Sequence, residues 1–264
     1  MTMTGTEIDA VELISEPDEA ERIGLAAYEV LVSDLTSLGP DEWRQVTVCA
    51  PWSVADMVRH LLGAAEATRS TYEMARQFLH GARKRGAFAG NTLDAVNDLQ
   101  VREHGHLDPG ETLDRLQAVY AESVVLRTHR SRLYDHIAIP VDAGGSTAAG
   151  MPRRLNLGRL FKVVYTRDVW LHRIDIARAL GRTPTLDAEV DRRVVADVAR
   201  EWADRHAQPF DLRLTGPAGG RYRRGDGGPT IDLDPSEFCW ILSGRGEPAP
   251  DIPGAGLLRH RVLF

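Results

Sequence analysis

LGRLFKVVYTRDVWLHRIDIARALG, residues 157–181, has the pattern of one long helix. Gly181 and Pro184 follow its last apolar position and predict where it ends. Asp168 and His172 are four residues apart, so their side chains lie about 40° apart around the helix axis and about 6 Å apart along it. This spacing lets one helical face offer two ligands to a single metal ion.

A third ligand would come from another helix, and His60 is the best candidate. Ser53 is a typical N-cap and Asp56 occupies the position of a capping-box acid, so a helix is predicted over 53–79. His60 lies on the apolar stripe of that helix. Two imidazoles and one carboxylate with an open position form the ligand set of a catalytic zinc site. The same set would suit nonheme iron or another divalent ion.

Each part of this pattern also has a simpler explanation. An Asp-x3-His pair often occurs by chance, and a single mid-helix histidine is more often a satisfied core or boundary residue than a ligand. Asp175 could hold His172 in place or could be an exposed partner of Arg178. His104 and His106 have no third ligand nearby and are expected to be exposed. Spacing alone therefore leaves the metal site as one hypothesis among several.

The chain up to residue 185 is predicted to be mainly helical. The predicted long helices are residues 7–36, 53–79, 111–137 and 157–180. Pro17 is expected to break the first turns of the first helix. Residues 83–110 are interpreted as a polar connection with a short helix at 93–99, and residues 138–153 as a loop. Long helices joined by a long crossover predict a four-helix bundle.

The character of the sequence changes after residue 185. The predicted elements there are a charged helix, short apolar strands and a final apolar segment: 187–206, 210–215, 230–233 and 238–242. Gly-rich turns separate them, which is typical of a small α/β unit. The chain is therefore expected to have an α+β fold with two domains, residues 1–185 and residues 186–264.

Composition excludes several classes of protein. The 264 residues carry a net charge of −6 at pH 7 with basic residues scattered among acids, so nucleic acid is a poor partner. No apolar run is long enough to cross a bilayer, and the acidic N-terminus has no secretory pattern. Cys49 and Cys239 are too few for a disulfide scaffold. A cytoplasmic protein that binds neither membranes nor nucleic acid is expected.

Two segments resemble the signature of a known family. The first is residues 49–61, CAPWSVADMVRHL, in which Trp52 precedes a helix that carries His60. The second is residues 167–181, RDVWLHRIDIARALG. In this order, on the second and fourth helices, they resemble the mycothiol-dependent maleylpyruvate isomerase family. The resemblance covers most of the chain and is strongest in the first 185 residues.

This resemblance implies a metal-binding four-helix domain of the DinB-like kind, followed by a smaller α/β domain akin to sterol-carrier-like folds. By matching of the motifs, His60, Asp168 and His172 take the metal-ligand positions, and zinc is the expected ion. The family often has Glu in place of Asp168, and Ala50-Pro51 replaces the common Pro-Gly. The shorter acid and the altered turn are departures from the family pattern.

Mycothiol is the thiol cosubstrate that the resemblance implies. A metal-coordinated thiol is deprotonated and becomes a nucleophile at neutral pH. The thiolate would attack an activated double bond in cis–trans isomerisation or displace a leaving group in thiol transfer, so the second partner is an electrophilic small molecule. Because the cosubstrate brings the sulfur, Cys49 is interpreted as a packing residue of its turn.

Other residues were weighed as parts of a binding site. Arg221, Arg223 and Arg224 lie among glycines, where they could bind a substrate anion, but a solvated loop is the favoured interpretation. Trp52 and Trp170 flank the two motifs and could wall a pocket. Aromatic residues at such helix positions are more often simply core.

Three functions are compatible with these features. The first is a mycothiol-dependent, metal-assisted isomerase or transferase. The second is a protein that binds metal or a small molecule without turnover, because a fold and its metal do not establish an activity. The third is a metal-dependent hydrolase, which is weakened because the motif lacks a neighbouring general base such as Glu.

Overall fold

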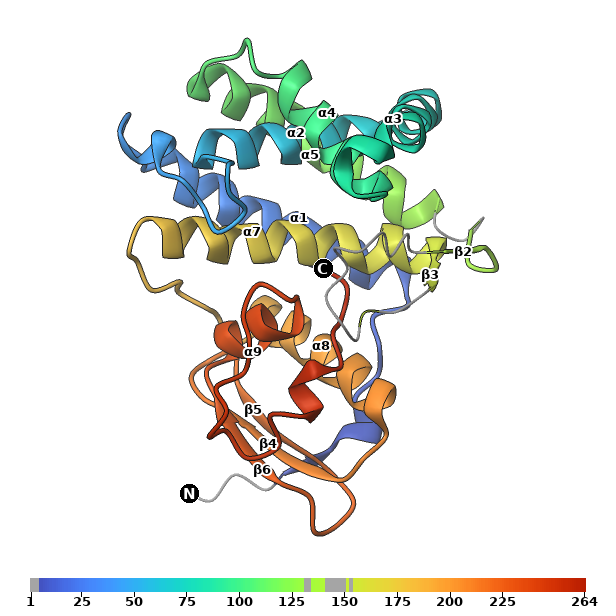
Figure 1. Ribbon diagram of the computed structural model, residues 1–264, viewed down its shortest axis with the longest axis vertical. Coiled ribbons are helices and arrows are strands. Elements are labelled where there is room, and N and C mark those ends of the chain that lie inside the picture. The colour runs from blue at the N-terminus through green and yellow to red at the C-terminus, as the bar shows by residue number, and fades with distance from the viewer. Residues whose placement is uncertain (1–4, 131–133, 141–150, 152–153) are drawn as a thin grey trace. The chain divides into compact units, whose positions relative to one another are not determined.

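The structure is a computed structural model, and it describes residues 5–130, 134–140, 151 and 154–264 (Figure 1). Contacts divide these residues into two units. The helical unit contains 15–130, 134–140 and 154–183, and the mixed unit contains 5–14, 151 and 184–264. Helices dominate the first unit and a small mixed sheet lies in the second, so the predicted α+β fold class is confirmed.

The long helices of the helical unit pack around one hydrophobic core (Figure 1). They are α1 (Pro17–Thr36), α2 (Val54–Arg69), α5 (Pro109–Arg130) and α7 (Tyr165–Ala179). Each of them contributes buried apolar residues to this core, for example Leu31, Leu61, Leu116 and Val169. Both α1 and α2 contact α5 and α7. The core therefore brings α2 and α7, which carry the predicted ligands, against each other.

A complete capping box starts α2, as predicted. The Ser53 hydroxyl accepts a hydrogen bond from the Asp56 backbone N–H, and the Asp56 carboxylate accepts one from the Ser53 N–H. Helix α2 ends sooner than predicted, because Ser70 is extended and its side chain caps the next helix, α3 (Thr71–Lys84). The expected single helix 53–79 is therefore wrong.

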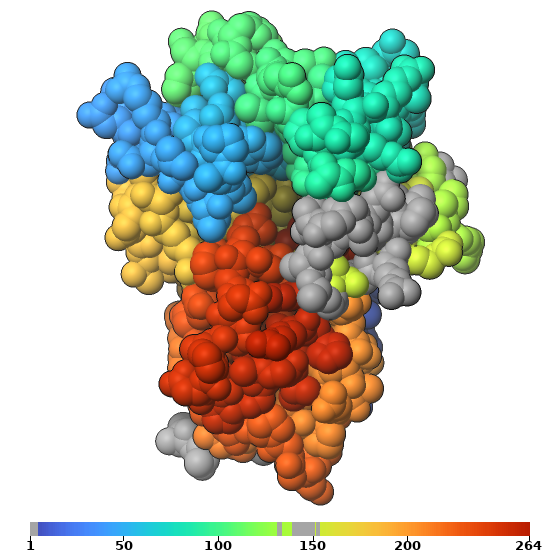
Figure 2. Space-filling model, viewed as in Figure 1, coloured from blue at the N-terminus to red at the C-terminus, as the bar shows by residue number. Residues whose placement is uncertain are grey.

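The predicted connection 83–110 is largely helical. A 3-10 turn, η3 (Arg85–Phe88), leads into α4 (Thr92–Glu103), which contains the short helix expected at 93–99. Buried Ala95, Val96 and Leu99 form the inner face of α4. Helices α3 and α4 pack on each other and on α2, and they form part of the surface of the helical unit (teal to green in Figure 2).

The first helix begins later than the sequence pattern predicts. Residue 7 was the expected start, but α1 begins at Pro17, since proline suits the first turn of a helix. The preceding residues form a short strand, β1 (Thr6–Glu7), and a 3-10 turn, η1 (Ile8–Ala10). Both belong to the mixed unit.

The predicted loop 138–153 contains strand structure. Strand β2 (Ala138–Pro140) pairs antiparallel with β3 (Arg154–Asn156). Residues 141–150 and 152–153 of the expected loop, and 131–133 near the expected end of the third helix, lie outside the described residues.

The fourth predicted helix is continuous but not uniform. It comprises α6 (Leu157–Arg159), the π-helical segment η5 (Leu160–Val164) and α7, so helix over 157–180 is confirmed. None of the helices in the described ranges is long and apolar enough to cross a membrane.

The mixed unit is built on a sheet with strand order β1-β5-β4-β6. Strands β4 (Phe210–Leu214) and β5 (Gly220–Arg224) form an antiparallel hairpin, and β6 (Thr230–Leu233) runs parallel to β4. Strand β1 runs parallel to β5, so residues near the N-terminus complete this sheet. The turn between β4 and β5 requires Gly219, because a Cβ there would lie 2.0 Å from the Leu214 carbonyl oxygen.

Two helices, α8 (Val190–His206) and α9 (Pro235–Leu242), complete the core of the mixed unit. Trp202 is fully buried and meets the rings of Phe210 and Phe238 edge-on, with centroids 4.8 and 5.5 Å away. Its indole N–H donates to the Leu257 carbonyl oxygen at 2.9 Å. Each unit therefore has a core of its own.

Candidate metal centre

The structure brings the three predicted ligands together in the helical unit. Nε2 of His60, on α2, lies 3.2 Å from Oδ2 of Asp168, on α7. Nε2 of His172 lies 3.2 Å from Oδ1 of the same carboxylate. Both histidine side chains are buried, whereas 22% of the Asp168 side chain is exposed. The carboxylate therefore bridges two buried rings and remains open to solvent on one side.

Ordinary helix packing puts the imidazole rings in place. Asp168 and His172 lie on neighbouring turns of one face of α7, and His60 lies on the buried face of α2. The His60 and His172 rings meet edge-on with centroids 5.3 Å apart. The ring of Trp52, just before α2, lies 5.3 Å from that of His60. His60 is thus packed against two aromatic rings that restrict its rotation.

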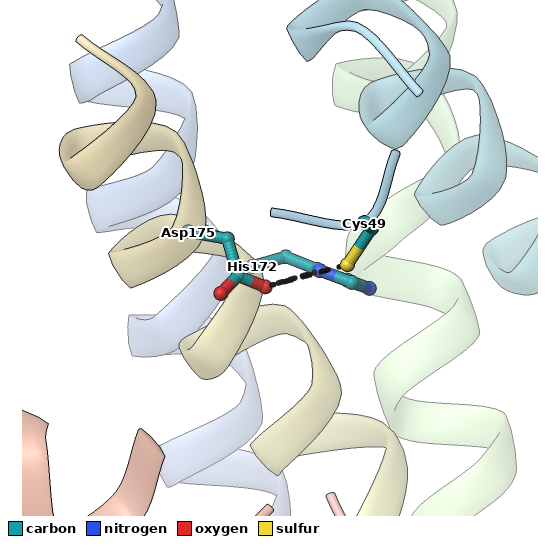
Figure 3. Close-up of side chains that lie close together, drawn as sticks. All are labelled: Cys49, His172 and Asp175. Atoms are coloured by element: carbon teal, nitrogen blue, oxygen red, sulfur yellow. Dashed lines mark hydrogen bonds and ion pairs between the residues drawn. The ribbon is translucent and has the colours of Figure 1, made fainter. Parts of the chain in front are cut away.

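A second carboxylate orients His172 (Figure 3). Nδ1 of His172 lies 3.1 Å from Oδ2 of Asp175, which is one turn further along α7 and fully buried. Oδ2 of Asp175 accepts from the ring, so Nδ1 carries a proton and Nε2 is the nitrogen left to face Asp168, as a donor to it or as a metal ligand. Of the two interpretations of Asp175, holding His172 in place is therefore the one that its burial favours.

An amide orients His60 in the corresponding way. Nδ1 of His60 lies 2.7 Å from Oε1 of Gln100, a buried residue of α4. A carbonyl oxygen only accepts, so Nδ1 carries a proton, and Nε2 is the nitrogen left to face Asp168 or to bind a metal. Nothing in the sequence pointed to Gln100, because the surrounding residues have the polar composition of a connection.

The chemistry of these groups suits a divalent cation. Burial raises the pKa of Asp168, but the charge and hydrogen bonds of His172 and His60 outweigh burial and hold it well below the usual range. The ionised carboxylate faces two imidazole nitrogens, and either protons on these nitrogens or a metal ion between them must supply the compensating positive charge. The ligand atoms of His60, Asp168 and His172 lie within 4.8 Å of one another. These residues therefore fit a divalent metal.

Comparison with known families agrees with the motifs. Residues 25–177, more than half of the chain, match the model of the mycothiol maleylpyruvate isomerase N-terminal domain. The chain belongs to this family. All three candidate ligands lie within the matched segment, so the family resemblance inferred from the sequence is confirmed.

Two solved structures share the fold of this family member. A crystal structure of a mycothiol-dependent maleylpyruvate isomerase is 16% identical, with a TM-score of 0.54, and the match covers 94% of this chain and 99% of that one. A histidine-to-alanine mutant of such an isomerase matches with the same coverage and TM-score at 14% identity. At these identities the similarity concerns the fold. Comparison with curated protein sequences gives no match.

Cys49 lies beside the candidate centre of this maleylpyruvate isomerase family member (Figure 3). Its Sγ is 4.0 Å from Oδ2 of Asp175, and Cys49, His172 and Asp175 each place a possible ligand atom within 4.8 Å of the others. Cys49 is half-buried and packs against the hydrophobic core, which agrees with a packing role.

The arginines among glycines lie on a strand and not in a solvated loop, so that expectation is wrong. All three belong to β5, whose backbone pairs with β4 and β1. Each forms an ion pair inside the mixed unit: Arg221 with Asp211, Arg223 with Glu7, and Arg224 with Asp204. Their charges thus serve contacts between strands and helix of the mixed unit.

The His-x-His pair divides into one buried and one exposed residue. His104 was expected to be exposed, but its Nδ1 lies 2.7 Å from the Gln100 carbonyl oxygen and its Nε2 lies 3.1 Å from Oε2 of Glu66. It is buried because α4 continues to Glu103 and folds onto α2. His106 is exposed, as predicted.

The two tryptophans also differ. Trp170 is almost completely buried, so the core interpretation holds for it. Trp52 is half-buried and covers the His60 ring, so it forms part of the wall of the candidate centre.

Proposed function

We propose that this protein is a metal-dependent enzyme that uses mycothiol to act on an electrophilic small molecule, by cis–trans isomerisation of an activated double bond or by thiol transfer. The observation that supports it most is the grouping of His60, Asp168 and His172, with both Nε2 atoms turned toward the carboxylate. Family membership supports mycothiol as the thiol, since the similar crystal structures are of a mycothiol-dependent maleylpyruvate isomerase.

Each side chain of the centre has a separate task. His60, Asp168 and His172 would hold the metal, with zinc preferred because two imidazoles and one carboxylate leave a position open for a substrate. A divalent ion there would supply the Lewis acidity that deprotonates a bound thiol, and isomerisation and thiol transfer both need the thiolate. Asp175 keeps the His172 proton on Nδ1. Trp52 shields the His60 ring from water.

The same proposal places the protein in the cytoplasm. Small thiols are kept reduced in that compartment, and Cys49 and Cys239 form no disulfide with each other. The net charge of −6 disfavours binding to nucleic acid, which leaves small molecules as the expected partners.

Metal content and thiol consumption test this proposal together. Elemental analysis of untagged wild-type protein should find about one divalent ion per chain, and His60→Ala, Asp168→Ala and His172→Ala should lose it. Wild-type protein supplied with mycothiol should isomerise maleylpyruvate or consume free thiol in the presence of an activated electrophile. The three variants should do neither.

His106→Ala is the matched control, because it removes an exposed histidine. It should keep both metal and turnover. Substoichiometric metal that is unchanged in the three ligand variants would exclude the metal centre. Full metal occupancy without any turnover would instead make the protein a metal-binding protein that is not an enzyme.

A further inference from the structure

A line of buried side-chain amides connects His60 to the outer helices α3 and α4. His60 Nδ1 lies 2.7 Å from Gln100 Oε1, and Gln100 Nε2 lies 2.7 Å from Oε1 of Gln77, on α3. Gln77 Nε2 lies 3.2 Å from the carbonyl oxygen of Gly63, on α2, and 2.9 Å from Oε1 of Glu73. His60, Gln77 and Gln100 are each no more than 4% exposed.

The direction of every hydrogen bond in this line follows from its far end. The Gly63 carbonyl oxygen only accepts, and so does the Glu73 carboxylate, whose pKa is lowered by hydrogen bonding to Arg76 despite some burial. The Gln77 NH₂ group must therefore face Gly63 and Glu73. Its carbonyl oxygen then faces Gln100, which must turn its own NH₂ group toward Gln77.

The last link is His60. Since the NH₂ group of Gln100 is committed to Gln77, the Gln100 carbonyl oxygen is the atom that faces His60 Nδ1. We infer that Gln100 and Gln77 form an amide relay that fixes the proton of His60 on Nδ1 and reserves Nε2 for the metal. This inference rests on the proposed metal centre. Gln100 is a positioning residue, because it acts through His60.

The relay differs from ordinary satisfaction of buried polar groups in one respect. A lone glutamine beside His60 could present either its oxygen or its NH₂ group, and the ring could then adopt either tautomer. Here the Gly63 carbonyl oxygen fixes the orientation of the Gln77 amide, and Gln77 in turn fixes the orientation of Gln100. Helices α3 and α4 thus have a task in the centre although neither carries a ligand.

Gly63 makes the close approach of Gln100 possible. A Cβ at residue 63 would lie 2.7 Å from both Cβ and Cγ of Gln100 and 3.2 Å from its Cα. Any side chain there would push α4 away from α2 and lengthen the bond to His60. Gly63 therefore serves the relay twice, through its carbonyl oxygen and through its missing side chain.

Metal affinity and tautomer measurements on Gln100 variants test the inference. Gln100→Leu removes the acceptor and should weaken zinc binding, measured by chelator competition, roughly 10- to 100-fold. Gln100→Glu keeps an acceptor toward Nδ1 but loses the NH₂ group that donates to Gln77, so it should lose less zinc affinity than Gln100→Leu without matching wild type. Gly63→Ala removes no polar group but should weaken binding in the same direction as Gln100→Leu.

Nitrogen-15 NMR of the His60 ring in metal-free Asp168→Ala protein gives a second readout, because this variant removes the carboxylate that competes for a proton at Nε2. With Gln100 intact the proton should lie on Nδ1, and the added Gln100→Leu substitution should give a mixture of tautomers. This readout separates the two proposals: wild type that binds no zinc refutes the metal centre, while the tautomer still tests the relay. A single Nδ1 tautomer in this double variant, or zinc affinity of Gln100→Leu equal to wild type, would overturn the inference.

His104→Gln distinguishes positioning from general loss of stability. His104 bonds the backbone carbonyl of Gln100 and leaves its side chain alone. This variant should lower the melting temperature of the metal-free protein and leave zinc affinity unchanged. If it weakens zinc binding as much as Gln100→Leu does, the effect belongs to α4 as a whole and the relay is refuted.

Discussion

Asp168 and Asp175 contact opposite nitrogens of one imidazole ring, that of His172. Asp168 lies 3.2 Å from Nε2, and Asp175 lies 3.1 Å from Nδ1. The first carboxylate is partly exposed and the second is fully buried. One lies on the solvent-exposed side of the proposed centre, and the other anchors the ring within the core. The two acids should therefore respond differently to substitution.

Removing the buried acid should weaken metal binding without abolishing it. Asp175→Ala leaves the His172 ring free to change tautomer, so zinc affinity should fall roughly 10- to 100-fold, as measured by chelator competition. Asp175→Asn keeps an acceptor for Nδ1–H and should lose less. Asp114→Ala, which removes an exposed acid on α5, should change nothing. Equal affinity in Asp175→Ala and wild type would refute the orienting role.

Removing the charge of the bridging acid should be more severe. Asp168→Asn leaves two imidazoles and a neutral amide, so zinc affinity should fall by more than about 100-fold. Asp168→Glu keeps the charge on a longer arm and should retain stoichiometric zinc. Titration with zinc by calorimetry distinguishes the two. Comparable loss in both variants would mean that the length of the acid, and not its charge, decides binding.

Much of the centre could be predicted from the sequence because helical spacing is local. Asp168 and His172 lie on one helix, where four residues always bring side chains to the same face. The Ser53 capping box predicted where α2 starts, and the apolar stripe of that helix predicted that His60 is buried. His60 could be joined to the other two only through the family motifs, because spacing within one helix says nothing about a neighbour.

The remaining features depend on contacts between distant segments. Gln100 reaches His60 only because α4 folds onto α2, and the polar surface of α4 concealed its buried face. Strand β5 escaped prediction because its glycines and arginines resemble a turn. Its pairing with β4 and with the distant residues Thr6 and Glu7 makes it a strand. In such cases pairing with neighbouring strands outweighs the low intrinsic strand propensity of the residues.

Two glycines of the helical unit should respond to alanine with opposite signs. A Cβ at Gly24 would lie 2.9 Å from Val124 Cγ1 and 3.0 Å from the Arg127 guanidinium, so Gly24→Ala should destabilise the protein by about 1–3 kcal/mol. Gly86 has open space around it, and Gly86→Ala should stabilise by about 0.4–1 kcal/mol. Urea unfolding measures both. Destabilisation by Gly86→Ala would contradict the open space around this residue.

The N-terminal segment should matter for stability although it lies far from the metal centre in sequence. Ile8 is fully buried in the mixed unit, and the Ile14 N–H donates to the Asp197 carboxylate at 2.7 Å. Ile8→Ala should destabilise by about 2–5 kcal/mol in urea unfolding. Glu12→Ala is the control, because it removes only an exposed surface charge and should be neutral. A neutral Ile8→Ala would refute the pairing of this segment.

Acid should destabilise the mixed unit through His206. Burial lowers the pKa of His206 to about 4. The nearby charges of His260 and Arg224 lower it as well, and the charge of Asp204 opposes them. The unfolded chain therefore binds the extra proton between pH 6.5 and about 4, so stability falls as pH falls through that window and does not change further below it. The loss attributable to this residue is at most about 3 kcal/mol.

Replacing His206 by Phe tests this assignment, because Phe keeps a ring beside Trp202 and cannot take up a proton. The variant should show a flatter decline of unfolding free energy between neutral and acidic pH, although it also loses the hydrogen bond from the Gln208 N–H. His106→Gln is the exposed control and should keep the wild-type slope. An unchanged slope in His206→Phe would assign the acid sensitivity elsewhere.

The pairing of β1 with β5 has a consequence for synthesis of the chain. Thr6 leaves the ribosome roughly 200 residues before its partner Tyr222, tens of seconds earlier at ordinary translation speed. In sequence the helical unit lies entirely between these two strands, so it can fold before β1 has a partner strand. The apolar side chain of Ile8 has no sheet to cover it until β5 has been made, and a C-terminal fragment made alone would lack β1.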